Sequence, residues 1–194
     1  MRDAQSVVSE NMNKWKESAK ELKILHNLVF CGLMAALGVV LSFVASIDVG
    51  PYLKIGFSSI PDRIIDCLFG PVTGAIFGGT LNIIKYFVKP SGDFNLLFTL
   101  NAMLADLIYG YFLYKKPVTI KNLLVSGFIV KLVVNVINNT ALLALMYGNA
   151  ISAILPVRAV KNLVMWPVDA LVQFVIITAV LKAFRQLKGR EGGF

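Results

Sequence analysis

The chain has 194 residues, of which 57% are hydrophobic and 15% charged, and its formal net charge is +8 at pH 7. Its mean hydropathy of +0.72 excludes an ordinary soluble domain. A spanning helix needs roughly 20 residues, so five or six spans leave little room for an extramembrane domain such as an ATPase. The apolar runs are too long for barrel strands, and the predicted fold is all-α, a polytopic bundle of six transmembrane helices.

The first 23 residues are polar and carry charges of both signs. They lack the short basic region, apolar run and cleavage site of a secretory signal, so we expect the first span to be retained. Lys16 and Lys20 lie near Glu17 and Glu21, which suits a short surface helix, and a frayed tail is an equal alternative.

Six apolar segments follow in chain order. Ser58 or Ser59 can cap the second, with Pro61 in its first turn, and Gly70 with Pro71 ends it. Ten residues rise only about 15 Å, so this segment either starts earlier or is shielded by its neighbours. The other segments are predicted at 25–46, 72–88, 95–114, 120–147 and 158–184.

Most of the 19 Lys and Arg fall at span ends on the same side as the N-terminus, and the positive-inside rule then places both termini in the cytoplasm. We therefore divide the chain into a cytoplasmic N-terminal segment (1–23), a six-helix transmembrane domain (24–187) and a cytoplasmic tail (188–194). Orientation does not explain the remaining cations, most of which fall in the outer half: Lys54, Arg63, Lys85, Lys89, Lys131, Arg158 and Lys161. Charges at that depth need a partner or a watery cavity.

Polar residues recur at helical spacing in the last two segments. The fifth segment has four residues at i, i+4, i+7 and i+8, which predicts one common face: Lys131, Asn135, Asn138 and Asn139. The sixth has a comparable stripe: Arg158, Lys161, Asn162, Trp166, Asp169 and Gln173. Amides that only hold helices together are one interpretation. Three cations on facing helices favour the other, a polar ligand site.

Other polar and aromatic residues have competing interpretations. The fourth segment has a polar side that is reached past Phe94 and Phe98: Asn95, Thr99, Asp106 and Tyr109. Arg63 and Asp66 at i, i+3 can neutralise each other, and we favour a structural role for them. Trp166 suits either a membrane interface or a stacking wall for a flat ring.

Small residues mark close helix contacts in two places. Gly32, Ala35 and Ala36 cluster in the first segment, and Gly74 and Gly78 are four apart in the third, where contact is made within the bundle or with a partner protein. The sequence has no nucleophile elbow, zinc-protease, Walker or paired-cysteine motif, so an enzyme is not expected.

Two runs resemble the loop and second helix of the substrate-binding S subunits of energy-coupling factor (ECF) vitamin transporters, KIGFSSIP at 54–61 and LFGPVTG at 68–74. Two more, FNLLFTLNAML at 94–104 and IYGYFLY at 108–114, are similar to the folate-specific branch of that family. The resemblance extends over about residues 25–187. Asp66 and Asp106 stand where the family pattern suggests Gly, and Asn82 stands where Asp is usual.

The resemblance implies an S subunit in a bacterial cell membrane that captures folate from outside with high affinity and has no ATPase of its own. It implies no bound cofactor and no nucleic acid. The partners implied are a transmembrane T subunit and two ABC-type ATPases that use ATP, and the S subunit would topple in the bilayer to release its vitamin. Gly32, Ala35 and Ala36 match the family's small-residue docking motif, and Gly74 and Gly78 are a second candidate docking surface.

Folate combines a flat pterin, a benzoyl ring and a glutamate tail with two carboxylates. We expect Trp166 with Phe94 or Phe98 to stack on the rings. The polar edges are assigned to Asn95, Asn135 and Asn138, and the carboxylates to Arg158, Lys161 and Lys131. The loop that carries Tyr52 and Lys54 is a candidate lid.

Three alternatives remain open at this point. The nearest is an S subunit for another anionic vitamin such as pantothenate. A small lipid-modifying membrane enzyme would use Asp62, Asp66 and Asp106, but such enzymes act at the cytoplasmic face, whereas the unexplained cations here lie toward the outside. A proton-coupled carrier would show inverted repeats, and none is evident.

Overall fold

The computed structural model describes residues 4–44, 46–48, 54–56, 58–88, 90, 94–147 and 151–191. The helices are α1 (Ala4–Glu21), α2 (Leu25–Val44), α3 (Ile60–Val88), α4 (Leu96–Leu113), α5 (Ile120–Val130), the π-helix η1 (Lys131–Asn138), α6 (Asn139–Tyr147) and α7 (Ile151–Glu191). Strands β1 (Ser46–Asp48) and β2 (Lys54–Gly56) form a short antiparallel hairpin between α2 and α3. The predicted all-α bundle is confirmed, and this hairpin is its one addition within the described residues.

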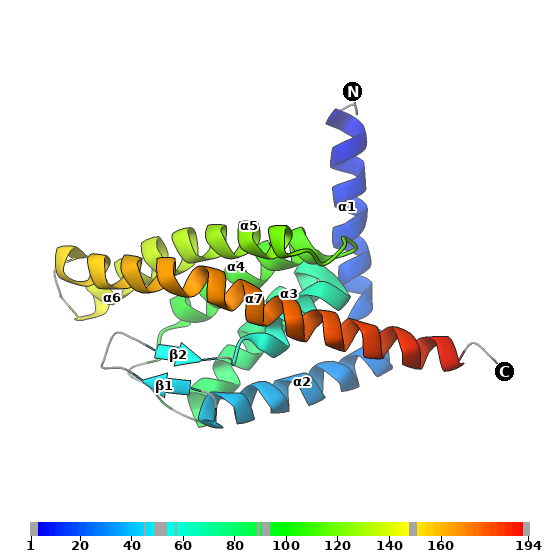
Figure 1. Cartoon of the computed structure of the whole chain (residues 1–194), viewed down its shortest axis with the longest axis horizontal. Helices are drawn as coiled ribbons and strands as arrows, with labels where there is room; N and C mark the ends of the chain where they lie inside the picture. Colours follow the sequence, from blue (N-terminus) through cyan, green and yellow to red (C-terminus); the bar gives the residue numbers. More distant parts are fainter. Residues whose placement is uncertain are drawn as a thin grey trace.

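The long helices run side by side, and α1 and the C-terminal end of α7 lie at the same end of the bundle, which we call the terminal end (Figure 1). Five helices in the described part of the chain are long and apolar enough to cross a membrane: Leu25–Val44, Ile60–Val88, Leu96–Leu113, Ile120–Leu145 and Arg158–Ala183. Large apolar side chains on their outer faces are exposed, among them Val44 at 81% and Val175 at 64%. Exposure of this kind on a bundle surface suits contact with lipid.

Helix α3 is two antiparallel halves rather than one rod. Gly70 has φ 87° and ψ −173°, a conformation open to glycine, and Pro71 follows it. Lys85 Nζ lies 3.8 Å from Asp62 Oδ2, although these residues would be about 34 Å apart along a straight helix. The predicted break at Gly70 and Pro71 is therefore confirmed.

The first half of α3 is a short segment that its neighbours shield. Every residue from 60 to 67 is buried, including Asp62, Arg63 and Asp66. Of the two explanations that the sequence left open, shielding is correct, because the helix does not start earlier than Ile60. Within the described residues the bundle thus has six helical segments, and the ten-residue half of α3 is too short to cross a membrane alone.

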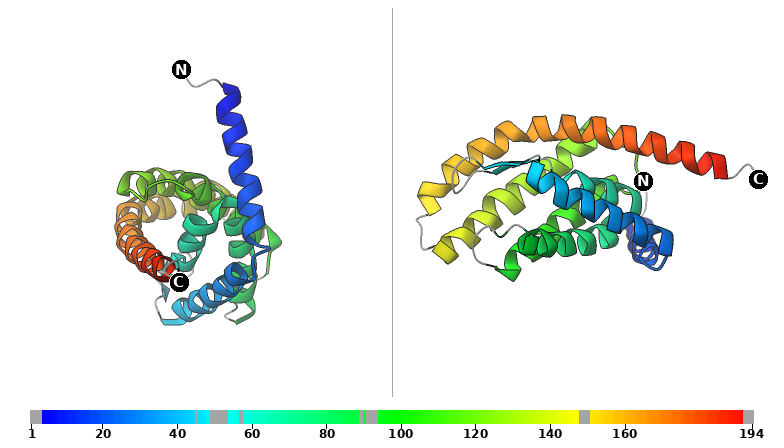
Figure 2. Two further views of the ribbon diagram at one scale, coloured as in Figure 1. Left: turned by 90° about the vertical axis from the view of Figure 1, so that its right-hand side faces the viewer. Right: turned by 90° about the horizontal axis from the view of Figure 1, so that it is seen from below.

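The other boundaries follow local chemistry. Helix α4 begins after Asn95, whose side chain accepts from Leu97 N, and α5 begins after Thr119, which accepts from Asn122 N. Helix α7 begins seven residues before the predicted 158 and continues past 184 to Glu191. It includes Pro156 and Pro167 and forms one long curved helix in Figure 2, as proline in a helix interior favours bending.

The apolar core has two clusters, one between α3, α4, α5, η1 and α7 and a smaller one between α2 and α3. Its most deeply buried members are Ile65, Leu81, Leu113, Leu123 and Ile177, none more than 1% exposed. The second half of α3 packs on α4 at glycines, and a Cβ on Gly110 would lie 2.5 Å from Pro71 Cα. This close approach fixes α4, and the polar residues that it carries, against the turn of α3.

Candidate functional site

A π-helix interrupts the fifth span at Lys131–Asn138. This segment contains three of the predicted site residues, Lys131, Asn135 and Asn138. Wide turns with i→i+5 hydrogen bonds are rare and occur frequently at functional sites. The π-helix therefore points to the same segment as the pattern of polar residues, and it does so from the backbone alone.

The π-helix also changes the direction of its polar side chains. Lys131 Nζ lies 2.7 Å from Asp169 Oδ2 of α7, while Asn138 Nδ2 donates to Asn101 Oδ1 of α4 at 3.1 Å. The α-helical spacing predicted a single face, and in a π-helix each residue turns through a smaller angle than in an α-helix. The polar side chains consequently bridge two neighbours instead of one.

Amides form a continuous network across this part of the bundle. Asn135 Nδ2 donates to Asn162 Oδ1 of α7 at 3.4 Å, and Asn139 Nδ2 donates to Asn135 Oδ1 at 3.4 Å. Asn101 Nδ2 donates to Asn139 Oδ1 at 2.7 Å, and Asn101 Oδ1 accepts from Asn138 Nδ2. Several of these bonds are long, so their replacement by other partners costs little.

Asn101 was missed as a site residue by the sequence analysis. It is 5% exposed, lies on α4 and also donates to Val134 O at 3.2 Å. A single amide within an apolar span was the available signal, because such a residue has to find partners inside the bundle.

Two cations border the amide network on α7. Arg158 is half-buried, and its Nη1 donates to Asn135 O at 3.4 Å. Its Nε is buried and has no hydrogen-bond partner in the described part of the chain. Lys161 is half-buried one turn further along α7. An unsatisfied buried guanidinium donor is a group that a ligand carboxylate can satisfy.

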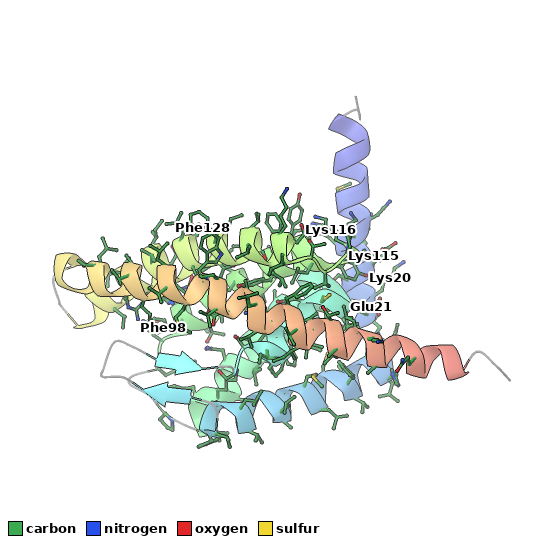
Figure 3. All side chains as sticks on the ribbon, viewed as in Figure 1. Lys20, Glu21, Phe98, Lys115, Lys116 and Phe128 are labelled. Atoms are coloured by element: carbon green, nitrogen blue, oxygen red, sulfur yellow. The ribbon has the colours of Figure 1, made fainter. Side chains whose placement is uncertain are left out.

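The aromatic candidates belong to two separate clusters. The Trp166 indole Nε1 donates to Leu124 O at 2.8 Å, and its ring centroid is 5.1 Å from that of Phe128. Phe94 is 46% exposed and packs at a centroid distance of 4.9 Å on Tyr86. Phe98 is half-buried and lies on the side of α7 opposite Phe128 in the view of Figure 3.

Asn95 has a structural role in this structure. Its Oδ1 accepts from Leu97 N at 2.9 Å and caps α4. The cap uses one of the two acceptor positions of the amide oxygen, and the interpretation of Asn95 as a reader of polar edges stays a prediction. Tyr52 lies outside the described residues, and for Lys54 only the backbone, at the start of β2, is described.

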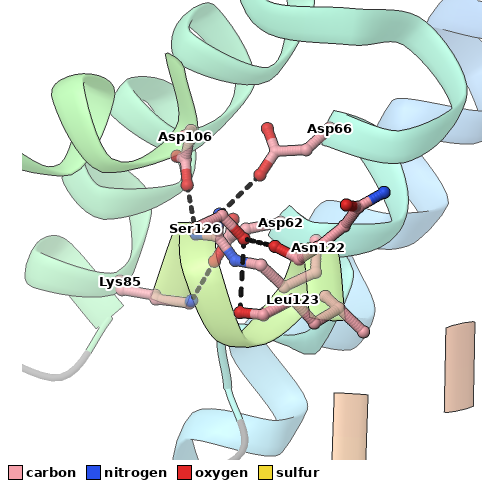
Figure 4. Close-up of polar contacts among 8 residues, drawn as sticks. Asp62, Asp66, Lys85, Asp106, Asn122, Leu123 and Ser126 are labelled. Carbon is pink, nitrogen blue, oxygen red and sulfur yellow. Dashed lines mark hydrogen bonds and ion pairs between the residues drawn. The ribbon is translucent and has the colours of Figure 1, made fainter. Parts of the chain in front are cut away.

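A second polar network consists of acidic and basic side chains and lies between the two halves of α3 and α4 (Figure 4). Arg63 Nη1 is 2.6 Å from Asp66 Oδ2, and Nη2 pairs with Asp106 Oδ1. The guanidinium lies 3.7 Å from the centroid of the Tyr109 ring. The predicted pairing of Arg63 with Asp66 is confirmed, with Asp106 as a further partner.

The two predicted docking surfaces differ sharply. A Cβ on Gly32 would meet nothing within 4 Å, Ala36 is exposed and Ala35 half-buried, so this face is open. Gly74 and Gly78 are buried, and a Cβ on either would collide with the carboxylate of Asp66 or Asp106. The prediction of a partner surface at Gly74 and Gly78 is therefore wrong, because these glycines make room for carboxylates inside the bundle.

A cavity of about 560 Å³ is present elsewhere, lined by residues such as Pro117, Val118 and Leu181. Pro117 and Val118 precede α5, whereas Lys131 follows it. This cavity is at the terminal end of the bundle, so it is separate from the amide network.

The apolar spans and the amides and cations between them define a polytopic membrane protein with a polar interior. Residues 26–177 match the family described as ECF transporter, substrate-specific component, and the chain belongs to that family. The match confirms the predicted S subunit, a multi-pass membrane protein that is a transport component and not an enzyme.

The chain is similar to particular members of this family. It is 32% identical over 151 residues to the folate transporter FolT of Clostridium novyi (strain NT), covering 78% of this chain and 87% of the relative. It is 27% identical over 157 residues to the folate transporter FolT of Leuconostoc mesenteroides, covering 77% and 83%. A crystal structure of FolT bound with folic acid has a TM-score of 0.74 at 28% identity and covers 80% of this chain and 95% of that one.

Proposed function

We propose that this chain captures folate from the extracytoplasmic side as the substrate-binding component of an ECF importer. A transmembrane T subunit and two ATPases would supply the ATP-driven step. The similarity to FolT proteins over most of both chains supports folate as the vitamin. Within the chain, the supporting observation is the unsatisfied Arg158 Nε next to an amide network on a π-helix.

The contacts suggest how folate would be held. The pterin edge presents several donors and acceptors, and it would replace the long bonds of Asn135 and the bond between Asn138 and Asn101. The glutamate carboxylates would pair with Arg158, whose planar guanidinium favours two-point binding, and with Lys161. Lys131 already pairs with Asp169, so a carboxylate there would have to compete with an internal partner.

The rings of folate need apolar faces beside this polar network. Trp166 is half-buried on the same helix as Arg158 and offers the larger ring surface, with Phe98 on α4 as the second candidate. The segment that carries Tyr52 and Lys54 remains our proposal for a lid over the outer opening.

The proposed orientation has both termini in the cytoplasm, as the positive-inside rule predicts. The π-helix and α6 lie away from the terminal end, toward the opposite end of the bundle (Figure 1). Cytoplasmic termini would therefore place the folate site in the outer half of the membrane. The open surface at Gly32, Ala35 and Ala36 would then contact the T subunit, since small residues permit close helix packing.

A fluorescence titration tests the choice of vitamin. The Trp15→Phe variant leaves Trp166 as the one tryptophan, and the purified protein is titrated with folate and with pantothenate. We expect quenching by folate and no response to pantothenate. A signal with pantothenate alone would contradict the proposal and support the alternative anionic vitamin.

A binding measurement in the assembled importer tests the docking surface. Gly32→Leu places a bulky side chain on the open face, and we expect it to reduce co-purification with the T subunit while folate quenching is retained. Gly32→Ala, which adds one methyl group, is the matched control. Equal recovery of the complex with both variants would contradict the assignment.

A further inference from the structure

Ser18 is fully buried in a helix that is otherwise half-buried or exposed from residue 12 to its end. Its Oγ donates to Phe69 O at 2.7 Å and accepts from Val72 N at 3.0 Å and Thr73 N at 3.2 Å. Thr73 Oγ1 donates in return to Ser18 O at 2.6 Å. The hydroxyl therefore uses its one donor and both acceptor positions.

These bonds solve a problem created by the turn of α3. The second half of α3 starts at Pro71, and its first backbone N–H groups have no partner within the helix. Ser18 supplies from α1 what an N-cap residue usually supplies from the chain just before a helix. A Cβ on Gly70 would lie 2.9 Å from Ser18 Oγ, so glycine is needed for this approach as well as for the turn.

A second contact restrains the direction of α1. Glu17 pairs with Lys115, which follows α4, and this hydrogen bond raises the pKa of Lys115. Helix α1 is thus attached at its C-terminal half to both α3 and the end of α4. These two contacts hold α1 in a position where it crosses the long helices. The N-terminal part of α1 projects beyond the bundle (Figures 1 and 2).

Helix α1 is also amphipathic in the part whose side chains are described. Met12, Trp15, Ala19 and Leu22 are spaced i, i+3, i+7 and i+10, which places them on one face. Met12 is 56% exposed, and the apolar surface continues at the start of α2, where Leu25 is 75% exposed.

Basic residues surround this apolar face. Lys20, Lys115 and Lys116 lie close to α1 and to one another in Figure 3. With Lys14, Lys16 and Lys23 they outnumber the neighbouring acids Glu17 and Glu21.

We propose that α1 is an interfacial helix that binds the anionic headgroup layer of the cytoplasmic leaflet. Its apolar face would lie at the boundary of the acyl chains, and its lysines would contact lipid phosphates. The assignment rests on the orientation in the proposed function. The crossing of α1 over the ends of the spans (Figure 1) and its positive charge favour a lipid surface, because such a helix can lie along the membrane boundary.

Quenching of Trp15 by brominated lipids in nanodiscs tests this proposal. The full chain and its Trp15→Phe variant are reconstituted in phosphatidylcholine, alone or mixed with phosphatidylglycerol, and the difference between the two proteins isolates Trp15. We expect quenching by lipids brominated near the headgroup, at least twofold stronger when phosphatidylglycerol is present. Quenching that does not depend on phosphatidylglycerol, or none by any brominated lipid, would overturn the proposal.

Charge variants make the test specific. Lys16→Gln with Lys20→Gln should abolish the phosphatidylglycerol-dependent increase, whereas Lys121→Gln with Lys182→Gln, which removes the same charge elsewhere, should retain it. Equal effects would overturn the assignment to α1. Protection of Trp15 that appears only with the T subunit and ATPases would also overturn it, in favour of a protein partner. Quenching of Trp166 by folate is recorded on the same samples. A failure of the folate proposal can therefore be distinguished from a failure of the lipid proposal for α1.

Discussion

Two polar networks lie inside this bundle, and they differ in the burial of their members and in the lengths of the bonds that join them. Arg63, Asp66 and Asp106 are each at most 5% exposed and joined by short charged contacts. The amides around the π-helix are mostly half-buried and joined by bonds as long as 3.4 Å. The charged side chains are therefore expected to keep their partners. The amides can replace their long internal hydrogen bonds by hydrogen bonds to a ligand.

The backbone differs in the same way. Beside the charged network, glycines bring the helices so close that a Cβ would overlap Asp66 or Asp106. Beside the amides, the helix is widened into eight residues of π-helix. A bundle of six segments can therefore combine a rigid half that fixes the fold with an adaptable half that binds.

The largest effect is expected from loss of the central cation. Arg63→Met leaves two carboxylates buried without their partner, and we expect the free energy of unfolding to fall by about 3–5 kcal/mol. Unfolding in mixed micelles measures it. Lys131→Met, which removes a half-buried cation from one carboxylate, is the control and should lose clearly less. If both variants lose the same free energy of unfolding, the two networks do not differ in how much they stabilise the fold.

Adding one methyl group gives the next effect. Gly78→Ala places a Cβ where the carboxylate of Asp106 now lies, and overpacking of this kind costs about 1–3 kcal/mol. Gly32→Ala adds the same group where nothing lies within 4 Å and should be neutral. Thermal unfolding of the two variants in detergent compares them, and a neutral Gly78→Ala would show that the charged network is not tightly packed.

Removal of the Ser18 hydroxyl comes third. Ser18→Ala leaves Val72 N and Thr73 N without their acceptor, and we expect a loss of about 0.5–2 kcal/mol, as for other N-caps. Hydrogen exchange at these amides should also accelerate. Ser9→Ala, earlier in the same helix, is the control. Unchanged exchange at residues 72 and 73 would contradict the capping role.

The smallest effect concerns pH. The hydrogen bond from Glu17 raises the pKa of Lys115 above its ordinary 10.5. A group with a raised folded-state pKa stabilises the fold fully below the unfolded-state pKa and loses this contribution as pH rises through the folded-state value. The stability difference between the unaltered chain and Lys115→Gln should therefore be small near pH 8 and shrink further above pH 10.5. A difference that grows with pH would contradict the pairing.

The sequence predicts the span order well because apolar length and turn residues act locally. Gly70 and Pro71 mark the turn of α3 correctly for this reason. The docking of α1 was not predictable, since Ser18 bonds to residues more than fifty positions away. The same limit applies to Gly74 and Gly78, whose spacing suggests a helix contact without showing that carboxylates occupy the space.

The candidate site was predicted in composition but not in geometry. Lys131, Asn135 and Asn138 were found from an α-helical period, yet the π-helix directs them to two different helices. Asn95 has the residue type of a ligand contact and serves as a helix cap. Residue type thus predicts that the interior of the bundle is polar. The hydrogen-bond partners of each side chain depend on which helices pack together, and residue spacing does not show this.

Calorimetric titration of folate into Arg158→Gln and Asn138→Ala tests the central claim most directly, with unfolding measured on the same samples. Loss of one charged or buried hydrogen bond should raise the folate Kd about tenfold or more, with the unfolding midpoint little changed. Unaltered folate affinity in both variants would contradict the assignment of the amide network as the folate site. If the variants lose folate affinity only when their unfolding midpoints fall as well, the amide network also supports the fold. That result would contradict the division into a binding network and a structural one.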